Sequence, residues 1–325
     1  MYLFCGRLNS ELFRPIGLDW FTGGYWQIAR VYADNMDTVR QYLDINDGAF
    51  TPFKNLNGGW TLNDGIYHIY DADTGMHQKA ITLEKFKEMD IDIVISSIPD
   101  HDRTFAQLIL DHKPSAKHIA QLGNIYQRTN IKNVMCSTGL EPEEGKNWVS
   151  YHQEFDLSIF RYEPPTNHNR VSSMVIGLPR RDLYGHYKGA LPDYEFRAYG
   201  GAEDGWLSSL QDIAKVMRES SFGWQVKPGG DGYGFCLHHW FACGRPVITF
   251  FRDYAPYLGN ALLEDGVTAI NLDGKEPQQV IEEIRYFSDP EKHKRMCENA
   301  YGRFREVVDF EEDALNVAAF LEKLI

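Results

Sequence analysis

Residues 223–248 read GWQVKPGGDGYGFCLHHWFACGRPVI, and this stretch decides the fold. A short apolar run leads into a loop that holds four glycines between Gly229 and Gly234. An apolar run of helical length follows and stops at Cys243-Gly244, and a second short apolar run begins at Pro246. This order predicts a strand, a glycine loop, a helix and a second strand. Because open α/β sheets bind ligands at the carboxyl ends of their strands, the loop is the first candidate for a ligand site.

The same alternation of short apolar runs and amphipathic stretches extends through the C-terminal half. It is the pattern that folds into a parallel sheet flanked by helices. The C-terminal half therefore predicts a complete doubly wound domain. Its expected strands are 171–177, 194–199, 223–226, 246–250 and 267–271, and its expected helices are 207–219, 235–242, 255–264 and 277–287.

The N-terminal half shows a similar pattern after an apolar opening at residues 2–5. We expect an amphipathic helix over 104–111, closed by Lys113-Pro114. The fold class expected for the whole chain is α/β, with two Rossmann-like doubly wound domains. The expected strands of the first half are 65–70, 91–97, 117–121 and 133–136, and residues 40–64 indicate no clear element.

A chain of 325 residues suits two domains of about 150 residues each. Pro164-Pro165 and the polar residues after them indicate a linker between the halves. The expected division is an N-terminal domain over 1–155, a linker over 156–170 and a C-terminal domain over 171–308. The last residues, 309–325, predict a helix that has no strand left to join and can pack back on the N-terminal domain.

The composition of the chain disfavours several classes of partner and structure. The formal charge of −13 disfavours nucleic acid and anionic lipid as partners. Five cysteines without a CxxC pair argue against a disulfide framework and a zinc ribbon, and predict buried free thiols. No basic leader opens the sequence and no apolar run approaches the roughly 18 residues that span a bilayer, so we expect a cytoplasmic protein without an integral membrane segment.

The glycine loop carries the candidate chemistry of the C-terminal half. Lys227 ends the expected strand and can reach a phosphate, and Asp231 can accept hydrogen bonds from sugar hydroxyls. His239 lies one turn into the helix, where its side chain should lean back toward the ligand. The alternative is that the glycines form only a turn, Asp231 caps the helix and His239 is a core histidine. The expected donor-binding residues of the loop are Gly229, Gly230, Gly232, Tyr233 and Gly234.

Two weaker signals lie in the N-terminal half. Gly23-Gly24 can form a strand-to-helix turn that lets a phosphate approach the backbone, although a plain surface turn would look the same. Asp100 and His101 follow an expected strand, so His101 can orient or deprotonate an acceptor hydroxyl. The competing interpretation is a helix-capping Asp100 and a solvent-facing His101.

Residues 231–248 resemble the donor-binding segment of retaining GT-B glycosyltransferases, especially family 4. The resemblance is specific over these 18 residues and thinner at 153–160, Gly23-Gly24 and 263–267. It implies a nucleotide-sugar donor bound by the C-terminal half, with Asp231 in place of the first family Glu. The second family Glu, which holds the nucleotide ribose, corresponds to His239.

The resemblance also implies cationic residues that neutralise the donor diphosphate. Arg180 or Arg181 and Lys188 or Lys227 are the candidates, with Arg180 and Lys227 preferred. It implies transfer without a metal ion or other cofactor, although Asp71-Ala-Asp73 matches a short metal-binding pattern that is common in turns.

The function expected from these features is transfer of a sugar from a nucleotide-sugar donor to a hydroxyl acceptor, which can be a saccharide, a lipid-linked molecule or a small molecule. A DNA-base glycosyltransferase, a non-catalytic nucleotide-binding protein and a GT-B-like epimerase or phosphorylase are the alternatives. The nucleotide base, the sugar, the acceptor and the oligomeric state stay open.

Overall fold

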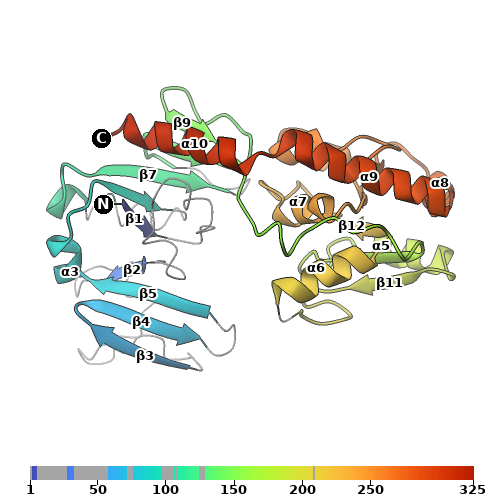
Figure 1. The fold of residues 1–325 in the computed structure, drawn as a ribbon, viewed down its shortest axis with the longest axis horizontal. Coiled ribbons are helices and arrows are strands. Elements are labelled where there is room, and N and C mark those ends of the chain that lie inside the picture. The colour runs from blue at the N-terminus through green and yellow to red at the C-terminus, as the bar shows by residue number, and fades with distance from the viewer. Residues whose placement is uncertain are drawn as a thin grey trace. The chain divides into compact units, whose positions relative to one another are not determined.

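The computed structural model describes residues 2–5, 28–32, 58–71, 76–96, 106, 109–123, 129–207 and 209–325 (Figure 1). The chain divides into two compact units. The first comprises residues 1–137, 141–154 and 311–325, and the second comprises residues 138–140 and 155–310. Each unit contains a five-stranded parallel sheet, which confirms the α/β fold class.

The second unit is built on a sheet with the strand order β11-β10-β12-β13-β14, and all of its pairs are parallel. The order reverses at β10, so this is a doubly wound sheet with a topological switch point. Its strands are β10 (Arg170–Ser173), β11 (Glu195–Ala198), β12 (Phe222–Trp224), β13 (Val247–Thr249) and β14 (Ala269–Asn271).

Helices cover both faces of this sheet. Tyr184 of α5 and Ile284 of α8 pack into one buried apolar cluster, and Met217 of α6, Trp240 of α7 and Phe304 of α9 pack into another. The helix α6 begins at an N-cap serine, Ser209, whose side chain accepts a hydrogen bond from the Asp212 backbone N–H. The helices are α5 (Arg181–Ala190), α6 (Leu210–Glu219), α7 (Phe235–Ala242), α8 (Pro277–Phe287) and α9 (Pro290–Val307).

Two helical segments of the second unit differ from the sequence prediction. Helix α5 is absent from the prediction because Gly185 and Gly189 lower the helix propensity of this segment. The predicted α-helix over 255–264 is wrong: two 3₁₀ helices, η2 (Phe251–Asp253) and η3 (Leu258–Leu262), lie in this region. Pro256 lacks a backbone N–H for an α-helical hydrogen bond, and the chain makes i to i+3 bonds instead.

The first unit contains a parallel sheet with the strand order β1-β6-β7-β8-β9. Ile93 and Ile119 of this sheet pack with Val317, Phe320 and Leu321 of helix α10 in one buried cluster. The C-terminal helix is therefore part of the core of the first unit. The elements are β1 (Tyr2–Cys5), β6 (Ile93–Ser96), β7 (Lys117–Leu122), β8 (Asn133–Cys136), β9 (Asn147–Ser150), α3 (Leu83–Glu88) and α10 (Phe310–Glu322).

A second sheet of the first unit, with the order β2-β5-β4-β3, departs from the predicted βαβ pattern. The strand predicted at 65–70 lies here as β4 and pairs antiparallel with both neighbours. Asp64 and Gly65 link β3 to β4 with φ values of 47° and 71°, as a tight two-residue hairpin turn requires. The strands are β2 (Ile28–Tyr32), β3 (Gly58–Asn63), β4 (Ile66–Asp71) and β5 (Met76–Thr82).

Part of the predicted helix over 104–111 lies outside the described residues, which are helical at 109–112. None of the helices in the described parts of the chain is long and apolar enough to cross a membrane. Cys243 and Cys297 are buried free thiols, as predicted, Cys136 is buried, and Cys236 is partly buried.

Candidate functional site

Three loops of the second unit come together at the carboxyl edge of its sheet. They follow β10, β12 and β13, and they contribute Arg180, the segment 225–234 and Asp253. Gly229 in the middle loop donates its backbone N–H to Asp253 Oδ1 at 3.3 Å, and Arg180 Nη2 lies 3.9 Å from Asp253 Oδ2. The ligand site predicted at this edge is therefore a compact group of charged residues around a glycine loop.

The glycine loop has a backbone that only glycine adopts without strain. Gly229, Gly230, Gly232 and Gly234 all have positive φ values, between 68° and 74°. The Gly230 N–H donates to the Lys227 carbonyl at 3.0 Å, which closes a turn. A Cβ atom on Gly230 would lie only 2.2 Å from the Asp253 carbonyl oxygen. Only glycine therefore allows the glycine loop to pack this closely against the loop after β13.

Lys227 and Asp231 form an ion pair across the glycine turn. The Lys227 side chain is 41% exposed and the Asp231 side chain 19% exposed. The pair thus lies at the surface of the loop, where a ligand can exchange with either partner. Asp231 is close to the start of α7, because a Cβ atom on Gly234 would be 3.9 Å from the Asp231 Cβ.

Arg180 is held in a defined position from two sides. It caps α5 with a left-handed backbone, φ 56°, which is unusual for a residue other than glycine. Its guanidinium lies over the Phe250 ring, 4.5 Å from the centroid, and faces Asp253. An arginine held in this way is preorganised to bind a phosphate with two parallel hydrogen bonds.

Arg252 is a third cation at this edge of the sheet, beside Lys227 and Arg180. Its guanidinium is 4.7 Å from the centroid of Phe250, and its Nε lies 3.2 Å from Asp273 Oδ1. Each cation at the edge is thus paired with a carboxylate: Lys227 with Asp231, Arg180 with Asp253, and Arg252 with Asp273.

The N-terminus of α7 points out of the same loop. Gly234 is the N-cap, with φ 73°, and no side chain accepts a hydrogen bond there. The first backbone N–H groups of the helix have no partner within the helix, and they carry its positive dipole end. Burial raises the pKa of the Cys236 thiol in this turn to about 12, which disfavours the reactive thiolate form.

His239 does not face an open ligand space, so that prediction is wrong. The residue is 3% exposed, and its ring stacks on Phe160 with centroids 3.7 Å apart. Phe155 and Phe235 meet the ring edge-on at 4.4 and 4.2 Å. Burial, with a smaller contribution from His238, lowers the pKa of His239 well below its ordinary value. The imidazole is therefore a neutral member of an aromatic core, as the alternative interpretation held.

Other residues of the predicted site lie apart from this group. Tyr233 is buried and stacks on His238 with centroids 4.2 Å apart, so its ring cannot reach a ligand from this position. Lys188 lies in the last turn of α5 and pairs with Glu203 at 2.7 Å instead of a site residue. Arg181, the first residue of α5, is exposed. Gly23, Gly24, Asp100 and His101 lie outside the described residues.

Sequence reasoning missed Asp253, Arg252 and Asp273. A signal was present, because Arg252 and Asp253 follow a predicted strand that ends at the same edge as the glycine loop.

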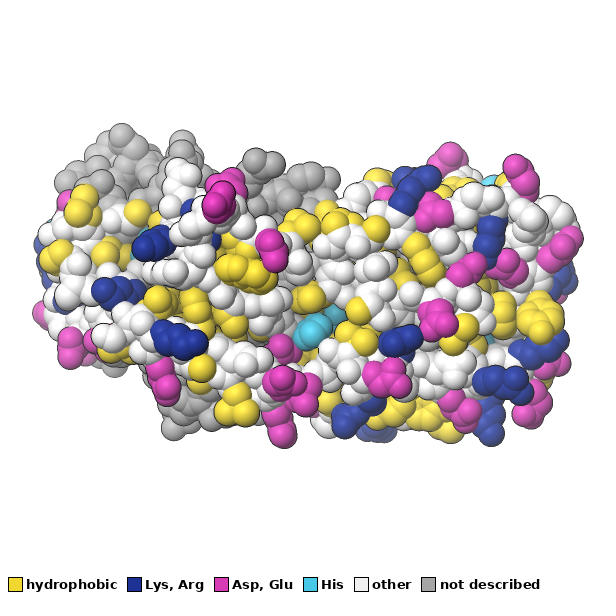
Figure 2. Space-filling model, turned by 90° about the horizontal axis from the view of Figure 1, so that it is seen from above, with side chains coloured by type: hydrophobic (Ala, Val, Ile, Leu, Met, Phe, Trp, Pro, Cys, Tyr) yellow, Lys and Arg dark blue, Asp and Glu magenta, His cyan; other side chains and the backbone are white. Residues whose placement is uncertain are grey.

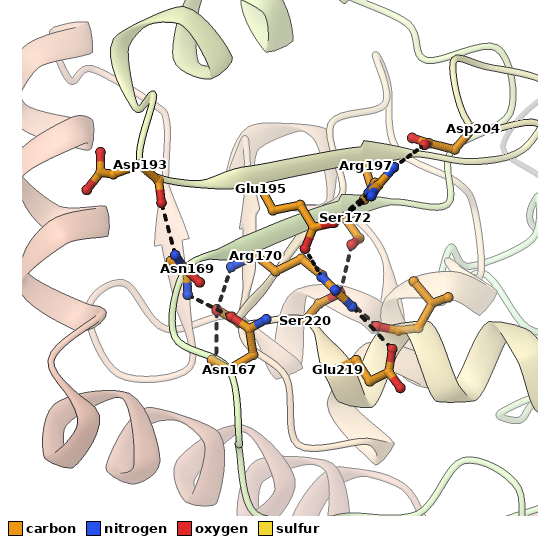
Figure 3. A network of polar contacts seen from close by, with 12 residues as sticks. Asn167, Asn169, Arg170, Ser172, Asp193, Glu195, Arg197, Asp204, Glu219 and Ser220 are labelled. Carbon is orange, nitrogen blue, oxygen red and sulfur yellow. Dashed lines mark hydrogen bonds and ion pairs between the residues drawn. The ribbon is translucent and has the colours of Figure 1, made fainter.

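A second charged network of the second unit has a structural role (Figure 3). Arg170 joins β10 to Glu195 of β11 at 2.6 Å and to Glu219 of α6 at 3.2 Å. Arg197 bonds Glu195 at 2.8 Å and Asp204 at 2.9 Å. Burial alone would raise the pKa of Glu195, but Arg170 and Arg197 hold it below its ordinary value. These side chains bind one another and fix the edge strand.

The comparisons with known proteins concern the fold. No protein family model matches the sequence, and no curated protein matches it. HepE from Anabaena, solved in complex with UDP, is 13% identical with a TM-score of 0.58, over 74% of this chain and 80% of its own. Sucrose-phosphate synthase from Thermosynechococcus elongatus is 12% identical with a TM-score of 0.60, over 79% and 85% of the two chains.

An α-glucosyltransferase in complex with UDP and a mismatched 13-mer DNA is 12% identical with a TM-score of 0.53, over 75% of this chain and 85% of its own. The chain shares the fold of these proteins. At identities this low the similarity shows that the fold of the two Rossmann-like units is shared. It does not show which reaction the chain catalyses, because the reaction depends on the side chains at the edge of the sheet.

Proposed function

We propose that this chain is a glycosyltransferase that moves a sugar from a nucleotide-sugar donor to a hydroxyl acceptor with retention of configuration. One observation carries the proposal: a loop of left-handed glycines meets Lys227, Arg180 and Asp231 at the carboxyl edge of a doubly wound sheet. Support also comes from the shared fold with proteins solved with UDP.

In this proposal Arg180, Lys227 and the first N–H groups of α7 bind the donor diphosphate. As the bond between the sugar and the diphosphate breaks, negative charge grows on the leaving group. Fixed cations and helix-end amides stabilise that charge most when they are already in place. Such a set of donors does the work that a metal ion does in other architectures, so the proposed reaction is metal-independent.

Asp231 is proposed to orient the sugar through its hydroxyl groups. In the chain without ligand its carboxylate is paired with Lys227. A bound donor offers Lys227 a phosphate and offers Asp231 hydroxyl donors, so both partners of the pair gain a new contact. The acceptor side stays a prediction: His101 is the expected group that orients or deprotonates the acceptor, and Gly23, Gly24 and Asp100 are the other acceptor-side or phosphate-loop candidates.

A thermal-shift screen against nucleoside diphosphates and nucleotide sugars tests the donor class. A ligand at 100 times its Kd stabilises the native state by about 2.7 kcal/mol, so the correct donor raises the Tm of the second unit. Release of nucleoside diphosphate from the selected donor then shows turnover. Binding without release would support the non-catalytic alternative.

Variants of the ion pair test the site. Lys227→Ala and Asp231→Ala should each lower donor turnover on the order of 100-fold. The Tm should change little, because a surface ion pair contributes about 0–1 kcal/mol to stability. Lys215→Ala is the matched control, since Lys215 pairs with Glu219 at the same i,i+4 spacing on the surface of α6. A large loss of stability in both site variants would show that the pair is structural.

DNA is a second candidate acceptor because one protein of the same fold was solved with DNA. The net charge of −13 opposes this candidate. Figure 2 shows acidic and basic side chains interspersed on the surface formed by α8 and α9. Arg303 of α9, for example, pairs with Glu264 at 2.9 Å. A salt-sensitive gel shift with duplex DNA would favour the candidate, and its absence at low salt would exclude it.

A further inference from the structure

The carboxylate of Asp253 is in contact with the glycine loop and with Arg180. We propose that Asp253 is an internal anion, which occupies the diphosphate position in the free chain and is displaced when the donor binds. The inference rests on the proposed function, because it concerns the same site. It assigns to Asp253 the control of how tightly the diphosphate is held and how fast it is released.

The contacts of the carboxylate are those expected for a phosphate. Oδ1 accepts the backbone N–H of Gly229 at 3.3 Å, and Oδ2 lies 3.9 Å from the guanidinium of Arg180. The side chain is only 11% exposed, so it fills this position instead of extending into water. A diphosphate that binds Gly229 and Arg180 must therefore compete with Asp253 for the same donors.

The backbone of Asp253 is held by its own contacts, so the proposed exchange requires movement of the side chain only. The Asp253 N–H donates to the Phe250 carbonyl at 3.1 Å within η2, and its own carbonyl lies directly over Gly230. A rotation about the side-chain bonds removes the carboxylate from Gly229 and leaves the loop in place. The glycine loop thus keeps its shape while the anion in it is exchanged.

The carboxylate is also held loosely for a buried acid. Both contacts are long for a carboxylate, and Oδ2 is a buried oxygen without a hydrogen-bond partner among the described residues. A phosphate has more acceptor oxygens and more charge than a carboxylate, so it satisfies Gly229 and Arg180 better. Exchange is then favourable at moderate donor concentrations, and the returning Asp253 helps to expel the nucleoside diphosphate.

The test is calorimetric titration of the full chain and the Asp253→Asn variant with inorganic pyrophosphate, UDP, GDP and ADP. Asparagine keeps the size of the side chain and removes its charge. We expect the Kd for pyrophosphate to fall on the order of tenfold in Asp253→Asn, with a similar fall for the preferred nucleotide and slower nucleotide release. Asp253→Ser, which is shorter and neutral, should shift the Kd in the same direction.

Asp193→Asn is the matched control, because Asp193 pairs with Arg285 on the surface of the same unit. It removes the same charge away from the site and should leave the Kd unchanged. Equal or weaker binding by both Asp253 variants would overturn the inference and make Asp253 a positioning residue for Arg180. Absence of binding by every variant would overturn it as well. Tighter pyrophosphate binding without turnover of any nucleotide sugar would instead support the internal anion and contradict the proposed transferase.

Discussion

Two buried histidines of the second unit are neutral because of their surroundings. His239 lies in the aromatic cluster with Phe155 and Phe160. His293 donates from Nε2 to the Ser221 carbonyl at 2.9 Å, so its Nδ1 must accept the hydrogen that His168 Nδ1 donates at 2.9 Å. Protonation of His293 would require His168 to change its tautomer so that its Nδ1 accepts.

This arrangement predicts a loss of stability in acid. Burial lowers the pKa of His293 from 6.5 to about 4. The hydrogen bond to Ser221 raises this pKa, whereas the nearby His168 and Arg245 lower it further. The unfolded chain takes up the proton first, so the free energy of unfolding falls as the pH drops from about 6.5 to 4. The full contribution is about 3 kcal/mol. In His293→Asn, urea unfolding between pH 7 and pH 4 should depend less on pH, and an unchanged slope would contradict the prediction.

At the same scale, Gly230 should be the least replaceable glycine of the loop. Alanine there combines a φ of 73° with a Cβ atom 2.2 Å from the Asp253 carbonyl. We expect Gly230→Ala to lower the free energy of unfolding by about 3 kcal/mol or more. Gly274→Ala, at φ 69° with open space around it, should lower it by about 1–2 kcal/mol. Urea unfolding compares them, and equal losses would show that the loop is free to shift.

At the scale of elements, Arg245 joins the ends of two helices to the linker. It is fully buried, and its guanidinium donates to the carbonyls of Arg218 and Ser220 at the end of α6. It also donates to Cys243 and Gly244 at the end of α7 and to Glu163 of the linker. The last carbonyls of a helix have no partner within it, and one cation satisfies both sets here.

Replacement of Arg245 should therefore destabilise the whole second unit. Arg245→Met keeps the apolar stem and leaves several buried carbonyls without donors, so we expect a loss of about 3 kcal/mol or more. Arg303→Met on α9 is the control, because Arg303 is a surface residue paired with Glu264 and Glu306. Chemical denaturation should show at most about 1 kcal/mol for the control. A similar effect of both variants would mean that the helix ends are satisfied by water.

At the scale of the whole molecule, the chain returns at its C-terminus to the unit that it built first. Helix α10 places Val317 and Leu321 against the parallel sheet of the first unit. His152 Nδ1 and Asp313 Oδ2, 2.9 Å apart, join residues that are separated by 161 positions in the chain. The first unit is therefore incomplete until α10 has been synthesised.

This organisation predicts that substitutions in α10 weaken the first unit. Leu321 is 1% exposed and Leu315, on the same helix, is 67% exposed. Leu321→Ala should cost about 2–5 kcal/mol, and Leu315→Ala less than about 0.5 kcal/mol. Proteolysis should then cleave Leu321→Ala first within residues of the first unit, as mass spectrometry of the fragments can show. Earlier cleavage in the second unit would contradict the division.

The sequence by itself determined the features that depend on neighbours along the chain. The α/β class, the order of the C-terminal strands and the glycine loop after β12 follow from local periodicity and from the φ values that only glycine adopts readily. The hairpin at Asp64-Gly65 had a local signal too, which the prediction overlooked.

Only the tertiary structure decided the features that depend on distant contacts. His239 became a core residue because it packs against Phe160 of the linker and Phe155 directly before the linker, about 80 positions earlier. Asp253 became part of the candidate site because the loop after β13 folds over Gly229, 24 positions away. Helix α10 joined the first unit because its apolar residues are buried there. The sequence shows that these residues are apolar, but it does not show which surface they will cover. Burial and ion pairing depend on what surrounds a residue in space, so the residue type alone does not determine them.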